Sequence, residues 1–597
     1  MPNIPARSEA DPKYTWAIED LYPSVEAWKA DGERARQLAA QAAGYQGRLA
    51  ESADTLLAYC RLEEQLGIVL DQYYGYAGRR ADEDTANAEG QAMAAQAMST
   101  VVHCMGELAF SGPELLAVAD ETMERFYAEQ PGLAVYRRSL EDQRRRRAHV
   151  LSAAEEKLLA AAGEMANAPE TVHSMLGDAD LTFDPIPGPD GEAIPVTNGS
   201  FIPLMESSDR AVRRAAFESL YHGYGKVINT SAAALAAQVN QLKFFAKARK
   251  YENTLAASLD ATNVPVPVYH NLIEAVHQDM HYLHKYMALR KKLLGVDELH
   301  MYDLYTPIVA DADIRVPFEQ AKSTVLDAVS VLGEGYQALL REGFENRWLD
   351  VYENQGKRSG AYSAGHRVHP YVLLNYKDTL DSEFTLAHEM GHALHSYLSN
   401  KTQAPVDAEY VIFVAEVAST CNEALLMQHL LKNTTDKKVR AYLINHFLEQ
   451  FRTTLYRQTM FAEFELKINQ ASEAGQALTP EMLNTLYHQL NVEYYGPDVV
   501  VDELIDLEWA RIPHFYYNFY VFQYATGFSA AMALSQRILA GGEAAVQDYL
   551  GFLKGGCSKS PIDLLKGAGV DMSSPEPVHA ALAQFGRLID ELEELLR

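Results

Sequence analysis

The chain has 597 residues and carries 81 acidic against 52 basic side chains, which gives a formal net charge of −29. So long a chain can bury more than one hydrophobic core. The strong negative charge disfavours nucleic acids and anionic membrane surfaces as partners, and the sequence has no apolar run of the roughly eighteen residues that a membrane span needs.

Helical patterns dominate the N-terminal part, because apolar residues recur there every three or four positions. The predicted helices cover residues 27–47, 52–76, 88–110, 112–129, 153–165, 209–223 and 230–248. We therefore predict a mainly α protein with a multi-helix body. The basic run at 144–147 is predicted to be the exposed face of a helix.

Two stretches interrupt the helices. Residues 181–202 contain Pro185, Pro187, Pro189 and Gly191 between short β-branched runs, which predicts a small hairpin. We place an approximate boundary there, between an N-terminal helical domain (1–200) and a catalytic domain (201–597).

The second interruption, at residues 352–375, predicts short strands that form a small β-sheet near the active site. Such a sheet would present backbone to an extended peptide at 360–363 or 371–375. Gly360 and Tyr362 are therefore predicted to bind substrate.

The most informative motif follows, at His388-Glu389-Met390-Gly391-His392. Residues four apart lie on one face of a helix, so both imidazoles can bind one metal ion. Glu389 then lies beside the ion, where a general base for a zinc-bound water is needed. Apolar residues continue the helix on both sides, and a metal satisfies buried polar groups more completely than packing does. The motif predicts a zinc peptidase.

A catalytic zinc takes three protein ligands and a water, so a third ligand is needed. The extended metallopeptidase motif would place a histidine ten residues after His388, but that position is Leu398. His395 is an alternative ligand, or a group behind the ligands, although its spacing matches no zinc signature.

Acidic residues downstream offer a better third ligand. Glu409, Glu416 and Glu423 repeat every seven residues and share one face of a predicted helix. Glu416 has the most apolar surroundings, so its carboxylate needs a buried partner. Two zinc-binding histidines supply one, although an arginine or lysine would also serve. Glu423 is placed to accept a hydrogen bond from a ligating histidine.

The chain resembles the oligoendopeptidase F proteins of the thimet oligopeptidase-like family of zinc metallopeptidases. The matching stretches of the C-terminal half, in the family's order, are residues 360–363, 370–376, 385–395, 413–419, 511–517 and 520–527. The N-terminal half resembles the group more loosely, through Trp16, residues 20–22 and residues 253–259.

This resemblance implies a helical body with a deep substrate channel that admits short unfolded peptides and holds one zinc ion per chain. It implies that the zinc ligands are His388, His392 and Glu416 and that Glu389 acts on the water.

The resemblance also implies a second group of residues opposite the metal. In it, His514 and Tyr524 would be catalytic and stabilise the oxyanion, while Tyr517 and Tyr520 would bind substrate. Spacing alone predicts that the three tyrosines form one helical stripe, which is more often core. His514 before the stripe and Gly527 after it favour a functional role. Which phenol stabilises the oxyanion stays open, because the spacing from His514 departs slightly from that of the thimet oligopeptidase branch.

We therefore predict a zinc-dependent endopeptidase that hydrolyses internal bonds of short oligopeptides. No Gly-x-Ser-x-Gly nucleophile motif competes with this mechanism. One alternative is a terminus-dependent zinc peptidase, a peptidyl-dipeptidase or carboxypeptidase, in which Arg511 would bind a free carboxylate. The other is a non-catalytic helical peptide-binding protein. Another divalent metal would also suit the ligands.

The four cysteines are scattered singly, and the first twenty residues contain no apolar segment. Both features predict a cytoplasmic protein. Its expected partners are short peptide substrates, with neither nucleic acid nor a membrane among them.

Overall fold

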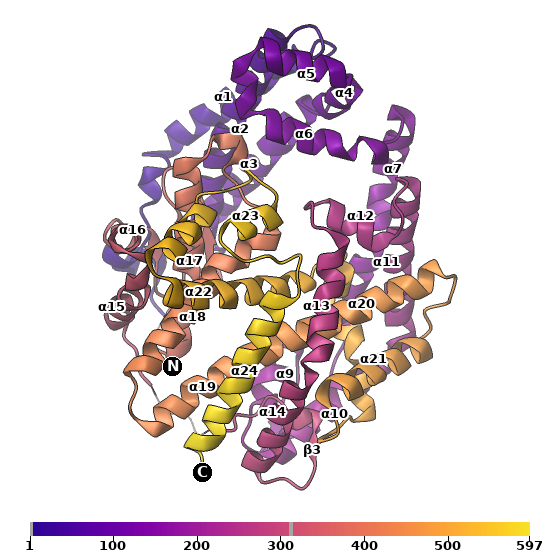
Figure 1. Ribbon diagram of the computed structural model, residues 1–597, viewed down its shortest axis with the longest axis vertical. Helices are drawn as coiled ribbons and strands as arrows, with labels where there is room; N and C mark the ends of the chain where they lie inside the picture. The colour runs from indigo at the N-terminus through magenta and orange to yellow at the C-terminus, as the bar shows by residue number, and fades with distance from the viewer. Residues whose placement is uncertain (1–3, 310–313) are drawn as a thin grey trace. The chain divides into compact units, whose positions relative to one another are not determined.

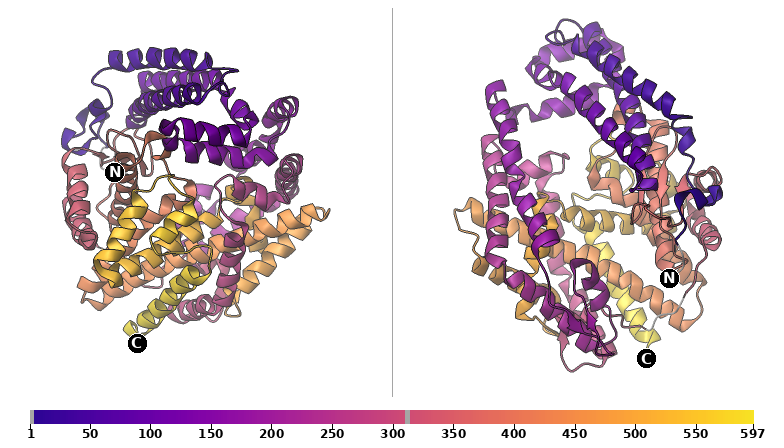
Figure 2. Two further views of the ribbon diagram at one scale, coloured as in Figure 1. Left: turned by 45° about the horizontal axis from the view of Figure 1, so that its top comes forward. Right: turned by 180° about the vertical axis from the view of Figure 1, so that it is seen from behind.

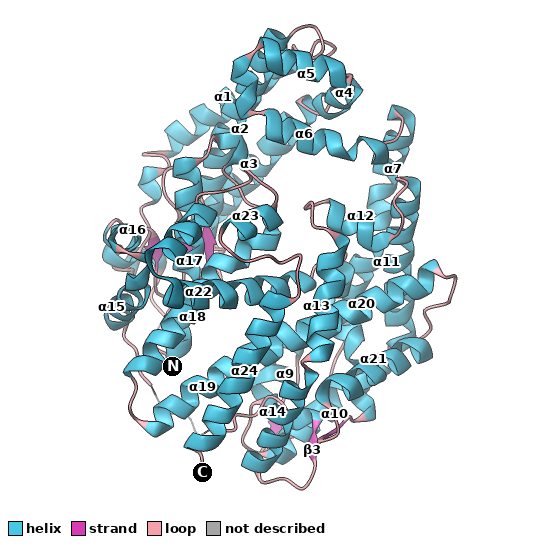
Figure 3. Ribbon diagram, viewed as in Figure 1, coloured by secondary structure: helices cyan, strands magenta, loops and turns pink. Residues whose placement is uncertain are grey.

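The computed structural model describes residues 4–309 and 314–597. It confirms a mainly helical protein with a few short strands (Figure 3). None of the described helices combines the length and the apolar character needed to cross a membrane.

The described chain folds into two compact units, each built from stretches that are distant in sequence. The first unit comprises residues 4–148, Ile314–His429 and Leu534–Gly569, and the second unit comprises 149–309, Leu430–Ala533 and Val570–Arg597. The expected division of the sequence at residue 200 is not tested by these interleaved units and stays a prediction.

The two units share the helices as follows. The first unit contains α1 (Val25–Ala43), α2 (Ala53–Glu83), α3 (Ala88–Glu107), α4 (Ser111–Ala117), α5 (Asp120–Glu129), α6 (Arg137–Arg145), α15 (Phe318–Ala328), α16 (Glu334–Glu345), α17 (Leu380–Thr402) and α23 (Pro561–Gly567). The second unit contains α7 (Ala153–Ala166), α8 (Ala168–Met175), α9 (Asn198–Met205), α10 (Arg210–Gly225), α11 (Ile228–Ala248), α12 (Thr254–Asp260), α13 (Val266–Gln278), α14 (Met280–Leu294), α19 (Lys437–Gln450), α20 (Arg457–Glu473), α21 (Pro480–Tyr495) and α24 (Glu576–Leu595). Two helices, α18 (Ile412–Asn433) and α22 (Phe522–Leu553), begin in one unit and end in the other.

Helices α1, α2 and α3 pack against one another in the first unit (Figures 1 and 2). Trp28 of α1 stacks on Tyr73 of α2 with ring centroids 4.6 Å apart, and its indole N–H donates to the Tyr73 carbonyl at 2.9 Å. A buried indole thus obtains both apolar contact and a hydrogen-bond partner. The helices predicted at the positions of α1, α2, α3, α7, α10 and α11 are confirmed, although α2 continues to Glu83.

The strands of the described residues form three small sheets. The predicted hairpin is confirmed by β1 (Ile186–Pro187) and β2 (Ala193–Ile194), which pair antiparallel. The predicted sheet at 352–375 is confirmed by β5 (Tyr362–Ala364) and β6 (Tyr371–Leu373), with β4 (Leu349–Asp350) parallel to the central β6. The third sheet pairs β3 (Leu299–His300) with β7 (Val499–Val500).

The single helix predicted at 112–129 is wrong, because the chain is extended at Val118 and forms α4 and α5 instead. Arg147 donates to the Val118 carbonyl at 2.9 Å, and Arg144 donates to the Leu115 carbonyl. These guanidinium groups satisfy carbonyls that the end of a helix leaves without partners. Arg144 is only 5% exposed, so the expected solvent-exposed face at 144–147 is also wrong for this residue.

The backbones of helices α17 and α18 pack directly against each other at Gly391. A Cβ atom added at Gly391 would lie 2.6 Å from the Cα of Ser419 and 2.8 Å from the carbonyl oxygen of Ala418. Nearby, the buried Asn422 of α18 donates to the Ala387 carbonyl of α17 at 3.2 Å and accepts from Tyr336 at 3.1 Å. Glycine at 391 therefore permits the close contact between these helices.

We expect Gly391→Ala to lower the free energy of unfolding by about 1–3 kcal/mol, the usual cost of overpacking a tight contact. The atoms that the new methyl group would meet belong to the backbone, so no change of rotamer can make room. Gly78→Ala in α2 is the control, because nothing lies within 4 Å of its added Cβ and alanine favours a helix. Denaturant unfolding measures both variants, and equal stability would contradict the expectation.

Candidate active site

The middle of α17 supplies His388, Glu389 and His392, and α18 supplies Glu416. The two Nε2 atoms of the histidines are 3.1 Å apart, and they lie 3.3 and 3.4 Å from Oε2 of Glu416. We call His388, His392 and Glu416 the donor group. Ligands at about 2.0–2.1 Å from a tetrahedral zinc lie roughly 3.3 Å from one another, so this triangle fits a zinc ion.

Two further residues of α18 orient the donor group. Nδ1 of His388 is 2.6 Å from Oε1 of Glu423, and a carboxylate at that nitrogen requires the proton to be on Nδ1. The Nε2 lone pair then faces the other donors, as metal binding needs. The Ser419 hydroxyl donates to Oε2 of Glu416 at 3.1 Å. Glu423 therefore lies where the sequence predicted it, within hydrogen-bond distance of His388.

Burial and neighbouring charges shift the pKa values of these side chains in opposite directions. Burial by itself would raise the pKa of Glu416, but hydrogen bonds from His388 and His392 lower the pKa overall. Burial by itself would lower the pKa of His388, but Glu416 and Glu423 raise it. Carboxylates therefore surround the two imidazoles, and the local field favours a cation.

Glu389 lies next to the donor group without belonging to it. The residue is 6% exposed, and its Oε2 is buried without a hydrogen-bond partner. Burial raises the pKa of Glu389, and the neighbouring histidines oppose this rise. A carboxylate oxygen with no other partner is available to take a proton from a water held by the donor group.

His395 does not join the donor group. Its ring stacks on Tyr410 with centroids 3.8 Å apart and an angle of 4° between the planes, and burial lowers its pKa to about 3. A neutral, stacked imidazole fits a packing role behind the donor group.

The structure assigns different environments to Gly360 and Tyr362. Gly360, at φ = 82°, lines a cavity of about 330 Å³ together with Asn375 and Thr385. Thr385 precedes His388 by one turn of α17, so this cavity runs along the helix of the donor group. The Tyr362 hydroxyl instead donates to Asp82 at 2.6 Å.

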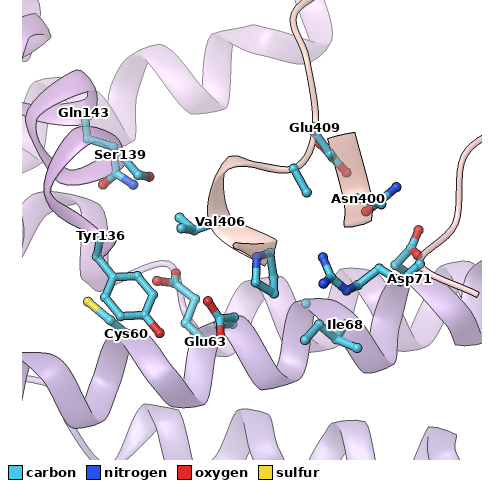
Figure 4. Close-up of a pocket in the computed structure, with 15 residues that line it drawn as sticks. Cys60, Glu63, Ile68, Asp71, Tyr136, Ser139, Gln143, Asn400, Val406 and Glu409 are labelled. Atoms are coloured by element: carbon cyan, nitrogen blue, oxygen red, sulfur yellow. The ribbon is translucent and has the colours of Figure 1, made fainter. Parts of the chain in front are cut away.

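Another cavity of the first unit, of about 300 Å³, lies among α2, the loop that follows α17 and the segment around Tyr136 (Figure 4). Glu63 and Asp71 line one side, and Val406 and Glu409 line another. None of the predicted site residues lines this cavity.

The second unit brings His514, Tyr517, Tyr520 and Tyr524 together, and we call these four residues the aromatic cluster. Nε2 of His514 is 3.4 Å from the Tyr524 hydroxyl, and its ring centroid lies 5.5 Å from that of Tyr517 and 6.3 Å from that of Tyr520. Burial lowers the pKa of His514, which favours the neutral imidazole.

The single helical stripe expected from the tyrosine spacing is wrong. Only Tyr524 lies in a helix, α22, whereas Tyr517 and Tyr520 lie in the loop between the 3₁₀ turn Pro513–Tyr516 and α22. Asn518 and Phe519 have φ angles of 57° and 58°, which a helix does not allow. Tyr517 is 44% exposed, so the cluster is not a packed core.

Sequence reasoning missed Gly391, Ser419 and Asn422, which position the donor group. Ser419 follows Glu416 by three residues and shares its helical face, so spacing could have identified it. The partners of Gly391 and Asn422 lie on a different helix, and no local pattern reveals them.

Comparisons with known proteins identify the family of the chain. The sequence model of peptidase family M3 matches residues 203–584, and that of oligopeptidase F matches residues 114–183. The chain is 46% identical to oligopeptidase PepF of Bacillus subtilis over 99% of this chain and 89% of that protein. It is 40% identical to an oligoendopeptidase F homolog of Lactococcus lactis over 99% of this chain and 98% of that protein.

Solved structures show the same relationship. The crystal structure of oligoendopeptidase-F from Enterococcus faecium matches with a TM-score of 0.75 at 38% identity, over 96% of this chain and 99% of that chain. A putative peptidase from Chlamydophila abortus matches with a TM-score of 0.93 at 35% identity, over 99% and 100% of the two chains. The chain therefore belongs to peptidase family M3, as a metallopeptidase of the oligoendopeptidase F type.

Proposed function

We propose that the chain hydrolyses internal bonds of short unfolded oligopeptides with one zinc ion held by His388, His392 and Glu416. The observation that carries this proposal is the triangle of donor atoms, 3.1 to 3.4 Å apart, beside the unpartnered carboxylate oxygen of Glu389. Peptides are the substrates that membership of the family implies.

In this mechanism Glu389 is the general base. When bound, zinc polarises the peptide carbonyl and lowers the pKa of its water from about 15.7 towards about 7. Glu389 takes a proton from the attacking water through its buried Oε2 and returns that proton to the leaving amine. Burial raises the pKa of the Glu389 carboxyl, which makes its carboxylate a stronger base. Glu423 holds the His388 ring in the tautomer that frees Nε2.

The proposal extends to the aromatic cluster. His514 and Tyr524 would donate hydrogen bonds to the peptide oxygen as it gains negative charge, and Tyr517 and Tyr520 would contact the substrate. The support is that the cluster gathers one imidazole and three phenols at a partly exposed position. Gly360 would contact substrate through its cavity, whereas a role for Tyr362 has less support because Asp82 engages its hydroxyl.

The environment of Arg511 favours internal cleavage over the terminus-dependent alternative. Its guanidinium lies 3.4 Å from Glu508 and over the ring of Phe201, and its side chain is only 16% exposed. A residue that captures a free carboxylate needs an accessible guanidinium group. The presence of Glu389, whose Oε2 has no hydrogen-bond partner, likewise favours an enzyme over a non-catalytic binding protein.

We expect Glu389→Gln to lower kcat by about 10²–10⁴, the usual contribution of a general base, while zinc stays bound. Glutamine keeps the shape of the side chain but cannot take the proton. Glu409→Gln is the matched control, because Glu409 is an exposed acid outside the donor group. Turnover of an internally quenched peptide and zinc content by mass spectrometry give the result. Wild-type turnover in the Glu389 variant would overturn the proposal.

We expect the enzyme to cut a peptide that is blocked at both termini, because internal cleavage needs neither a free amine nor a free carboxylate. A chelator should abolish this cleavage, and added zinc should restore it. Mass spectrometry of the products locates the cut. Cleavage that requires a free terminus would support the alternative, and cleavage unaffected by the chelator would exclude the metal mechanism.

We expect His514→Ala and Tyr524→Phe each to lower kcat by about 10²–10³ with little change in KM, as the loss of one oxyanion donor does. Tyr516→Phe is the control, because Tyr516 is buried against His173 outside the cluster. Steady-state kinetics measures all three variants. Unchanged kcat in both cluster variants would remove these two residues from the mechanism and leave the role of Glu389 intact.

A further inference from the structure

The loop that carries the aromatic cluster has an unusual backbone. Asn518 and Phe519 both adopt left-handed φ angles, and among the described residues they are the only neighbouring non-glycine pair that does so. Asparagine tolerates this conformation, but a bulky phenylalanine does so rarely. A strained pair of this kind persists only where the surroundings hold it, and such pairs concentrate at functional sites.

Glu465 of α20 holds the second residue of this pair. Its Oε1 accepts a hydrogen bond from the Phe519 backbone N–H at 2.7 Å, and its Oε2 is buried without a partner. The side chain is 1% exposed. A carboxyl group in that position is costly to bury, and the loop amide is the partner that it gains there.

Gln238 of α11 holds the first residue of the pair. Its side-chain N–H₂ group donates to the Tyr516 carbonyl at 3.0 Å and to Oδ1 of Asn518 at 2.9 Å, and the residue is 2% exposed. Side chains from two helices of the second unit therefore form hydrogen bonds to successive residues of one short loop. Tyr517 precedes these residues and Tyr520 follows them, so the backbone angles of the loop set the directions of both phenols.

We propose that Glu465 and Gln238 are positioning residues for catalysis, which fix the strained Asn518–Phe519 backbone and thereby orient His514, Tyr517, Tyr520 and Tyr524. This inference rests on the proposed role of the aromatic cluster. Neither residue touches substrate; each acts through the loop.

The protonation state of Glu465 makes a conservative variant informative. Burial raises the pKa of Glu465 to about 8, so the neutral acid predominates at pH 7. Its carbonyl oxygen still accepts the Phe519 N–H in that form. Glutamine has nearly the same shape and offers the same acceptor, so Glu465→Gln should preserve the contact, whereas Glu465→Ala removes it.

The test compares Glu465→Ala, Glu465→Gln and Gln238→Ala in the full-length zinc-loaded enzyme. Asn469→Ala is the matched control for a buried truncation in α20, because its side chain donates to the backbone carbonyl of Glu465 at 2.9 Å and leaves the Glu465 side chain and its bond to the loop in place. We measure kcat and KM on a quenched peptide, zinc content, and hydrogen exchange of the Phe519 amide.

We expect Glu465→Ala to speed exchange of the Phe519 amide by at least about tenfold, because its acceptor is lost. The same variant should lower kcat by about tenfold or more through misplaced donors and should also raise KM, because the substrate-contacting Tyr517 and Tyr520 are misplaced with them. Gln238→Ala should lower kcat in the same way. Glu465→Gln should restore protection and turnover, and the Asn469 variant should match the wild type.

Wild-type exchange of the Phe519 amide in Glu465→Ala would overturn the positioning role, whatever the kinetics. Faster exchange with unchanged kcat would also overturn it, since a mobile loop would then not matter for turnover. If Glu465→Ala fails to fold, the kcat and the Phe519 amide exchange of Gln238→Ala and Glu465→Gln test the positioning role instead. If the aromatic cluster has no catalytic role, His514→Ala and Tyr524→Phe will both keep the wild-type kcat. That result distinguishes failure of the proposed function from failure of the positioning role.

Discussion

The contact between α17 and α18 at Gly391 is the constraint on which the geometry of the donor group depends. The motif histidines and Glu416 lie on two helices joined by a loop, so their meeting needs the helix backbones to approach closely. The backbone of Ser419 lies where a side chain at 391 would be. One turn away, Asn422 of α18 donates a hydrogen bond to the Ala387 carbonyl of α17. A donor triangle with edges of 3.1 to 3.4 Å follows from this packing.

Much of the donor group could be predicted from the sequence because its determinants are local. The four-residue spacing of His388 and His392 places both on one helical face, and the seven-residue repeat of Glu416 and Glu423 does the same on the next helix. The contact at Gly391 could not be predicted, since its partners are 27 and 28 residues away in the chain. Helices predicted from apolar periodicity agree with the structure in most cases. The break at Val118 could not be predicted, because the arginines that donate to the carbonyls at this break lie 29 residues further along the chain.

The tyrosine segment shows where periodicity misleads. Spacings of three and four predicted a helix, but the backbone at Asn518 and Phe519 takes a form that local sequence does not favour. The hydrogen bonds that support this form come from α20 and α11, which are distant in sequence. Tertiary contacts here outweigh local preference. The two groups thus differ in origin: helical spacing together with the α17–α18 contact forms the donor group, whereas long-range hydrogen bonds hold the loop of the aromatic cluster.

The interleaving of the two units has a consequence for how the protein is made. The first unit needs residues near the N-terminus, residues in the middle of the chain and the stretch that ends at Gly569. A ribosome therefore releases almost the whole polypeptide before either unit has all its parts. Domains that are continuous in sequence can fold one after another during synthesis, but these units cannot. The apolar helix faces of both units therefore lack some of their native partners until translation is nearly complete.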